Sequence, residues 1–259
     1  GTTGANPFNA VIWKPFEKGS PVQDLGVMNG PNSEGRAINA HSNTAGLTGT
    51  IVVPHAYFSI GKLPTVLEPM PGASHTFANA LNDHGAIVGG AIMNQQGVQG
   101  QPALWHDGEW TGLGWLTGAH AGGARAINNL FQIGGSCTSS ALGQRAFLWQ
   151  TGSMHDINDL LVGTAAIARR VSGINDAGQI LVEALLKGKT VAMRLAPIDR
   201  PVTDLNADCR TNVPDLMMLL EQWGPLPRNV GGGLAPTADF NRDGGVDVLD
   251  LLILLGNWG

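Results

Sequence analysis

The chain has 259 residues, a formal net charge of −5, 14% charged residues and 43% hydrophobic residues. This length and hydrophobic content suffice for one or two domains with a core and exclude a wholly disordered chain. Only 15 Lys and Arg residues are present, which excludes a broad nucleic-acid-binding surface, and no apolar run reaches the length of a membrane-spanning helix.

The chain begins at Gly1 without a cationic and apolar leader, a pattern expected of a mature secreted protein and equally of an engineered start. Its two cysteines, Cys137 and Cys209, are too few for a disulfide framework. One bridge or two free thiols are both compatible with this count.

Four short elements recur along residues 9–198. The first is small–apolar–Asn and ends, at spacings of 43, 46 and 47 residues, at Asn39, Asn82, Asn128 and Asn175. The second is a Gly-punctuated apolar run, the third ends in an aromatic or large apolar residue, and the fourth follows a turn such as Asp107-Gly108. Each element contains β-branched or aromatic residues and is bounded by turn-forming residues, a composition typical of strands. Four strands in ~45 residues is the size of a β-propeller blade.

Residues 9–198 resemble the HAF family of extracellular repeats, whose name comes from a His-Ala-Phe motif in the third strand. The segments His55-Ala56-Tyr57-Phe58 and Arg145-Ala146-Phe147-Leu148-Trp149 carry the resemblance. It implies an extracellular location and a mainly β, propeller-like body of about four blades.

The ends of the repeat array differ from its middle. The chain opens with third and fourth elements (10–26) and closes with first, second and third elements (173–195). Split ends are typical of a ring that closes by sharing one blade between the termini. One third element is left over, so an additional partial blade, a strand donated to a neighbouring molecule and an open stack of repeats all remain alternatives.

The excess negative charge lies in residues 201–259, which hold three Arg and eight Asp or Glu. Two segments, 204–215 and 239–250, place oxygen side chains at loop positions 1, 3, 5, 9 and 12. Such loops suit a hard divalent cation, with a backbone carbonyl at position 7. The predicted ligands are Asp204, Asn206, Asp208, Arg210 (carbonyl), Asn212 and Asp215 in the first loop, and Asp239, Asn241, Asp243, Gly245 (carbonyl), Asp247 and Asp250 in the second.

This tail is similar to the dockerin module, in which two EF-hand-like loops are each followed by one helix. The copies are offset by 35 residues, and helices are predicted over Leu216 to Trp223 and Leu251 to Trp258. The resemblance implies two Ca²⁺ ions and predicts domains of residues 1–198 and 199–259. Position 6 is Gly244 in the second loop and Cys209 in the first, which predicts a weaker first site.

Positions 10 and 11 of the two loops are Val213-Pro214 and Val248-Leu249. Dockerins recognise cohesin partly through hydroxyl residues at these positions. The apolar pairs therefore favour intramolecular contact or self-association.

The repeat body offers few candidates for chemistry. No nucleophile elbow, phosphate loop or zinc spacing is present. His55 is expected to pack, and Arg169-Arg170 is expected to be a solvated pair. Trp13, Trp105 and Trp149 recur at the repeat period and are expected in the core, whereas Trp110 and Trp115 fall outside that register and could stack on a sugar or fill an interface.

The sequence therefore predicts a secreted, non-catalytic, calcium-binding protein for structure or attachment, and not an enzyme. One hypothesis makes it the self-assembling subunit of an extracellular filament or surface layer, through the calcium module and the spare strand. The alternatives are a glycan-binding, lectin-like module and a dockerin-tethered polysaccharide-active enzyme. The predicted partners are a second protein or a second copy, with a glycan as an alternative, and with no nucleic acid and no membrane span.

Overall fold

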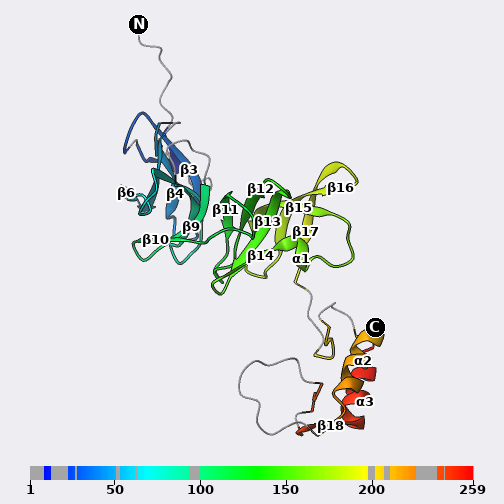
Figure 1. The fold of residues 1–259 in the computed structure, drawn as a ribbon. Coiled ribbons are helices and arrows are strands. Elements are labelled where there is room, and N and C mark those ends of the chain that lie inside the picture. The colour runs from blue at the N-terminus through cyan, green and yellow to red at the C-terminus, as the bar shows by residue number, and fades with distance from the viewer. Residues whose placement is uncertain are drawn as a thin grey trace, which may run out of the picture. The chain divides into compact units, whose positions relative to one another are not determined.

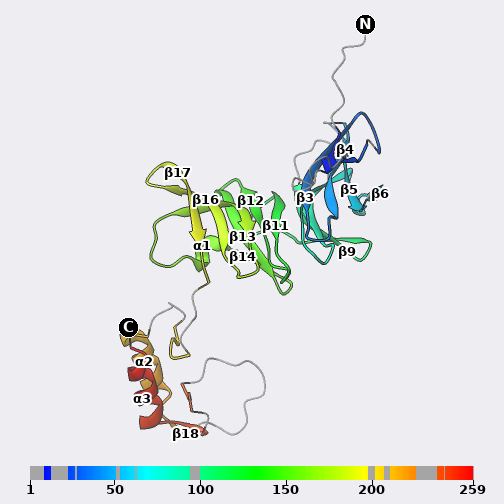
Figure 2. The same cartoon turned by 180° about the vertical axis from the view of Figure 1, so that it is seen from behind.

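A computed structural model describes residues 9–12, 23–26, 28–50, 53–61, 63–93, 100–197, 202–206, 211–225, 238–241 and 243–258. The chain divides into two compact units, Gly1–Ala196 and Pro197–Gly259. Figures 1 and 2 show that strands make up the first unit and that the two longer helices belong to the second. None of the helices in the described ranges has the length and apolar character needed to cross a membrane.

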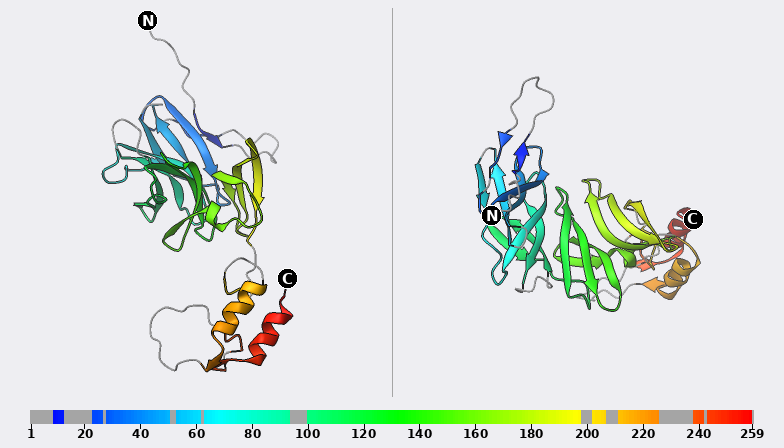
Figure 3. Two further views of the ribbon diagram at one scale, coloured as in Figure 1. Left: turned by 45° about the vertical axis from the view of Figure 1, so that its right-hand side comes forward. Right: turned by 90° about the horizontal axis from the view of Figure 1, so that it is seen from above.

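The first unit is mainly β, as predicted, and its sheets follow one another along the chain (Figure 3). Each sheet is antiparallel and is built from strands that are consecutive in sequence, an arrangement compatible with a propeller-like fold. The first four-stranded sheet contains β3 (Asn32–Ile38), β4 (Thr44–Gly49), β5 (Pro54–Ile60) and β6 (Leu63–Val66). The second contains β7 (His75–Leu81), β8 (Ile87–Ile92), β9 (Gly100–His106) and β10 (Glu109–Gly112). The third contains β11 (Ala121–Ile127), β12 (Ile133–Ser139), β13 (Gly143–Gln150) and β14 (Ser153–Asp156), and the short helix α1 (Ile157–Leu160) follows it.

The two ends of the array are incomplete sheets. The last sheet has three strands, β15 (Ile167–Ile174), β16 (Ile180–Leu186) and β17 (Lys189–Leu195). The N-terminal strands β1 (Val11–Ile12) and β2 (Gln23–Asp24) pair with each other. Their described contacts lead to the first four-stranded sheet, because the Ala10 N–H donates to Ser33 Oγ at 2.9 Å and Leu25 packs with Tyr57. Within the described part of the chain, β1 and β2 therefore form a sheet of their own and do not complete the last one.

The recurring Asn of the first element joins one repeat to the next. Each side-chain oxygen closes its own turn; that of Asn82, for example, accepts the N–H groups of His84 at 3.1 Å and Ala86 at 2.9 Å. The amide nitrogen donates to the backbone carbonyl of the corresponding Asn in the following repeat, from Asn39 to Asn82 at 3.0 Å, from Asn82 to Asn128 at 3.2 Å and from Asn128 to Asn175 at 2.9 Å. We call this series the asparagine ladder.

The residue after each of these Asn residues adds a second row of bonds. The Ala40 N–H donates to Asp83 Oδ1 at 2.8 Å, the Asp83 N–H donates to Asn129 Oδ1 at 2.8 Å, and the Asn129 N–H donates to Asp176 Oδ1 at 2.7 Å. The bonds from the Ala40 N–H and the Asn129 amide lower the pKa of Asp83, because they stabilise its charged form. Both rows run from each turn to the next, so the four turns are held in a fixed order.

A β-bulge interrupts each first strand near its end. In β3, β7, β11 and β15 the register shifts at Arg36, Asn79, Arg125 and Ser172. Opposite the first three bulges the second strand carries Gly46, Gly89 or Gly135. A Cβ on these glycines would lie 1.9, 1.7 and 2.2 Å from the carbonyl oxygens of Glu34, Phe77 and Gly123. The Gly of the second element is therefore required by the close approach of the bulged strand.

The bulge glycine gives a stability prediction. Gly89→Ala should destabilise the first unit by about 3 kcal/mol, because the added methyl group overlaps a strand carbonyl that the sheet holds in place. Gly173→Ala is the matched control: Gly173 stands where the other repeats have Ala37, Ala80 and Ala126, and its added Cβ would meet only Leu181 Cβ at 4.0 Å. Urea unfolding of both variants measures the difference, and equal stability would contradict the packing argument.

The asparagine ladder gives a second prediction. Asn82→Asp keeps the shape and the turn-closing oxygen but places an oxygen against the Asn128 carbonyl, so a loss of about 2 kcal/mol is expected at neutral pH. Asn175→Asp is the control, because the amide of Asn175 is exposed and donates to the Gln179 side chain within its own turn. Thermal unfolding of the two variants compares them, and a loss at Asn175 as large as that at Asn82 would show that the inter-repeat bond is unimportant.

Candidate functional site

In the second acidic loop, residues 239–250, backbone N–H groups donate to the carboxylates of the same loop. The two oxygens of Asp239 accept the N–H groups of Asp243 and Gly244, each at 3.1 Å, and Asp243 Oδ1 accepts the Gly245 N–H at 3.2 Å. Asn241 Oδ1 also accepts the Asp243 N–H at 3.0 Å. Gly244 has φ +98°, so the sharp turn expected at loop position 6 is present.

The last residue of each loop is a fully buried carboxylate that holds the loop closed. Asp215 Oδ1 accepts the N–H groups of Leu205 at 2.7 Å and Asn206 at 3.1 Å, and its Oδ2 accepts that of Asn212 at 2.9 Å. Asp250 repeats the pattern 35 residues later, with 2.7, 3.2 and 3.0 Å to the N–H groups of Phe240, Asn241 and Asp247. Three accepted bonds occupy three of roughly four lone-pair positions of a carboxylate. Each of these two carboxylates, Asp215 and Asp250, therefore has about one lone pair left to bind a further ligand.

These closures also explain where the helices begin. The helices α2 (Val213–Glu221) and α3 (Val248–Gly256) start three residues before the predicted positions. Loop position 9 is the N-cap, since Asp247 Oδ1 accepts the Leu249 N–H at 2.7 Å, and loop positions 10 to 12 form the first helical turn. Pro214 suits this first turn because no intrahelical acceptor is needed there.

The donor chemistry fits a hard cation, but the carboxylates do not converge. All predicted donors in the described residues are carboxylate, amide or carbonyl oxygens, as Ca²⁺ prefers. Asp208 and Arg210 lie outside the described residues, so the first loop is only partly seen. Over the described ranges, no group of three or more His, Cys, Asp or Glu side chains is close enough to hold a metal ion. In the described parts of both loops, Asp215, Asp239, Asp243 and Asp250 accept hydrogen bonds from backbone N–H groups.

The two helices pack through one face and expose another. Leu219 and Leu254 are fully buried in a core with Leu205, Ala238 and Val246. The antiparallel pair β18 (Gly224–Pro225) and β19 (Gly245–Val246) ties the end of the first half to the second loop. Eight large apolar side chains, each 45–59% exposed, form two equivalent rows that we call the apolar stripes: Val213, Met217, Leu220 and Trp223 on the first half, and Val248, Leu252, Leu255 and Trp258 on the second.

The aromatic residues singled out in the body have mainly packing roles. Trp105 packs against a buried cluster, with its ring 5.6 Å from that of Phe58, and Trp149 packs against the next cluster. Trp110 fills an interface between two clusters and donates from Nε1 to the Glu68 carbonyl at 2.9 Å. Trp115 is 39% exposed and donates to the Gly100 carbonyl at 3.0 Å. Trp13 lies outside the described residues.

Cys137 is a buried free cysteine in the first unit, and burial raises the pKa of its thiol, so it is a poor nucleophile. Cys209, its potential partner, lies outside the described residues.

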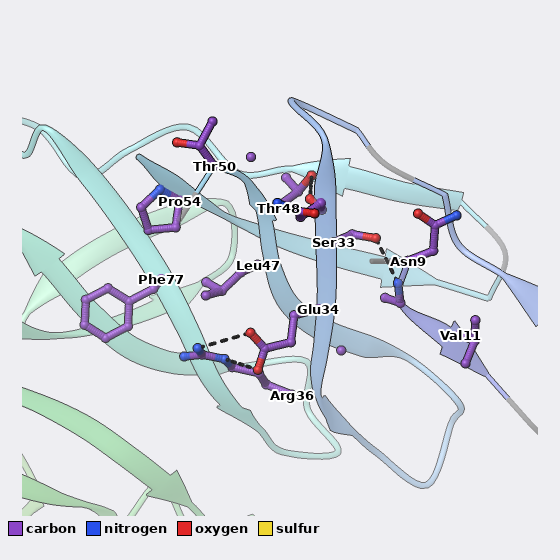
Figure 4. A pocket seen from close by; sticks show the side chains of 14 residues that line it. Asn9, Val11, Ser33, Glu34, Arg36, Leu47, Thr48, Thr50, Pro54 and Phe77 are labelled. Atoms are coloured by element: carbon purple, nitrogen blue, oxygen red, sulfur yellow. Dashed lines mark hydrogen bonds and ion pairs between the residues drawn. The ribbon is translucent and has the colours of Figure 1, made fainter. Parts of the chain in front are cut away.

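Three cavities lined by described residues of the repeat body are relevant here. The largest, of about 870 Å³, lies beside the N-terminal residues Asn9 to Val11 and is lined by Ser33, Glu34, Thr48 and Phe77 (Figure 4). A second, of about 670 Å³, is lined by the bulge residues of all four first strands. A third, of about 310 Å³, is lined by the four Asn turns. Because all four repeats line both of the latter cavities, the first strands face a common axis.

The second cavity corrects one expectation about the body. Arg170 was expected to be a solvated pair with Arg169, but it lines this cavity together with Arg36 and Arg125, and its Nη2 lies 2.6 Å from Glu183 Oε2. The sequence signal was available: Arg36 and Arg125 occupy the same position of the repeat, directly before the small–apolar–Asn motif.

Of the comparisons with known proteins, only the one with solved structures found similar proteins. No family model matches the chain, and neither does any curated protein sequence. Among solved structures, a gluconolactonase from Xanthomonas campestris, described as important in glucose secondary metabolic pathways, is similar with a TM-score of 0.39 and 13% identity. The similarity covers 68% of this chain and 66% of that chain, so it spans just under two thirds of the gluconolactonase.

This comparison contradicts the predicted function. The protein was expected to be a non-catalytic structural or attachment protein and not an enzyme, whereas the similar solved structure is an enzyme. We therefore withdraw the non-catalytic prediction, the filament hypothesis derived from it and the glycan-binding alternative. A likeness of this degree assigns no activity, and we assign no catalytic residue.

Proposed function

We propose that the second unit is a calcium-binding docking module, similar to a dockerin, that brings the propeller-like body to a protein partner outside the cell. The observation that carries this proposal is the duplication itself. Two loops 35 residues apart share the same closing carboxylate, the same helix start and the same exposed apolar stripe.

The charge of the unit supports calcium as the cofactor. The described residues of the second unit include seven Asp and Glu and no Lys or Arg. Carboxylates gathered in this way repel one another, and a bound divalent cation removes that repulsion. The residues that would hold the ions are the oxygen donors at positions 1, 3, 5, 7, 9 and 12 of each loop, and the ions would supply charge neutralisation and a stiffer loop. Calcium-dependent folding suits an extracellular setting, which we propose as the location.

The apolar stripes support a protein partner. Four large apolar side chains recur on each half, and exposed apolar patches of this kind mark interaction surfaces. The surrounding carboxylates favour a partner whose apolar patch is bordered by Lys and Arg.

Calcium binding is tested on the full chain after removal of metal with a chelator. Calorimetric titration should find two Ca²⁺ ions per chain, and far-ultraviolet circular dichroism should show a gain of helix. At free calcium one hundred times the Kd of a site, each occupied site should add about 2.7 kcal/mol to the stability of the second unit. Asp243→Asn should weaken one of the two sites at least tenfold, whereas Asp107→Asn, in an exposed turn of the body, should leave both unchanged. Absence of heat and of any change in helix content would refute the calcium proposal.

The docking surface is tested with the double variant Met217→Gln, Leu252→Gln, which removes one central side chain from each stripe. Because both side chains are about half-exposed, the melting temperature should change little, while binding of the apolar dye bis-ANS to the calcium-loaded chain should fall severalfold. Leu219→Ala, in the core of the same unit, should instead cost about 3 kcal/mol of stability.

Sedimentation of the calcium-loaded chain distinguishes the two kinds of partner. A monomer at high concentration is expected for a module that binds a different protein. A dimer that the stripe variant abolishes would show that the stripes pair with a second copy, against our proposal.

A further inference from the structure

The second cavity of the repeat body is lined by cationic side chains that come from different repeats. Arg36 lies on β3, Arg125 on β11 and Arg170 on β15, and Asn79 and Ser172 occupy the corresponding bulges of β7 and β15. The bulges are a regular feature of the repeat, so the cavity is built by the architecture of the whole unit. It is independent of the C-terminal docking module.

The three guanidinium groups are unequally compensated. Arg36 forms an ion pair with Glu34, at 3.2 Å from Nε to Oε1, and donates from Nη1 to Asn79 Oδ1 at 2.7 Å. Figure 4 shows this pair close to Phe77. Arg170 is paired with Glu183.

Arg125 differs from the other two, since it makes no ion pair or hydrogen bond with any residue that the structure describes. Burial and the nearby Arg170 and Arg36 lower the pKa of Arg125, and the charge of Glu183 opposes this shift.

The cavity has unused donors that match an oxyanion. A guanidinium carries five N–H groups in a planar fork that fits a carboxylate in a bidentate manner. Arg170 uses one of its nitrogens for Glu183, and Arg125 uses none. The Ser172 hydroxyl and the ring of Phe77 border the same space. A volume of about 670 Å³ is in the range of small-molecule sites.

We propose that this cavity binds a small hydroxylated carboxylate, of the size and chemistry of a sugar acid. Arg125 forms the central bidentate pair with the carboxylate, and Arg170 adds a second guanidinium. Ser172 and the free N–H groups bond the hydroxyls, while Phe77 contacts a carbon face. The bound carboxylate supplies a direct ion-pair partner, which Arg125 does not have among the described residues.

The test is a calorimetric titration of the full chain with D-galacturonate, D-galactose and inorganic sulfate as probes. Galacturonate should bind, galactose should not, and sulfate should bind at least tenfold more weakly because it offers no hydroxyls. Arg125→Gln should weaken galacturonate binding at least tenfold without lowering the melting temperature, since Arg125 makes no described hydrogen bond. Arg194→Gln removes the same charge from an exposed position on β17 and should have no effect.

Two results would overturn the proposal. Equal losses in the Arg125 and Arg194 variants would mean that only the overall charge attracts the probe. Sulfate binding as tight as galacturonate would mean that the cavity is a general anion site without recognition of a hydroxylated carboxylate.

A second readout guards against a folding defect in the glutamine variant. Phenylglyoxal modification of Arg125, followed by peptide mass spectrometry, should slow severalfold in wild-type protein when galacturonate is present and should be unaffected by galactose. Unchanged modification in the presence of galacturonate would also refute the site.

Discussion

In three of the four repeats, the amide of the asparagine that follows the first strand bonds to the next repeat and holds the repeat body in order. One side chain closes its own turn through its oxygen and reaches the backbone of the next turn through its nitrogen. An apolar residue at this position would leave both the turn and the neighbouring carbonyl without their partners, in a place where Asn82 and Asn128 are almost fully buried. The alignment of four sheets around one axis, and with it the two axial cavities, depends on this repeated bond.

The β-bulge of each first strand lies three residues before this asparagine. It brings Arg36, Asn79, Arg125 and Ser172 to the axis, and it requires a residue without Cβ on the neighbouring strand in three of the four repeats. In the last repeat Val182 stands at that position and the register of β15 shifts twice. The side chains that line the axis are free to vary in chemistry because the bonds that order the repeats are made elsewhere. This separation of scaffold and lining is common in repeat folds.

Much of the fold could be predicted from the recurring elements, because strand composition and turn residues act locally. The turns at Asp107-Gly108 and Thr151-Gly152 have the positive φ angles expected of tight hairpins. The inter-repeat role of the asparagines was not foreseen, since the bonds join residues 43 to 47 positions apart and depend on how sheets pack. Likewise, Arg36 and Arg125 recur at one position of the repeat, but their placement at a common cavity with Arg170 depends on the bulges and on the packing of the sheets. In the tail, the ligand spacing was clear, but the helix starts were predicted too late because loop positions 10 to 12 are already helical.

The last asparagine of the ladder, Asn175, makes no bond to a following repeat within the described residues. In the last repeat, the amide of Asn175 donates to Gln179 in its own turn, since no fifth turn follows. Each bond of the ladder joins only two neighbouring repeats. No single bond therefore fixes how many repeats the body contains. A gene duplication that inserts one more unit between two existing ones would meet compatible bonding groups on both sides. The body is therefore built in a way that lets its length, and the circumference of its axial cavities, change by whole units during evolution.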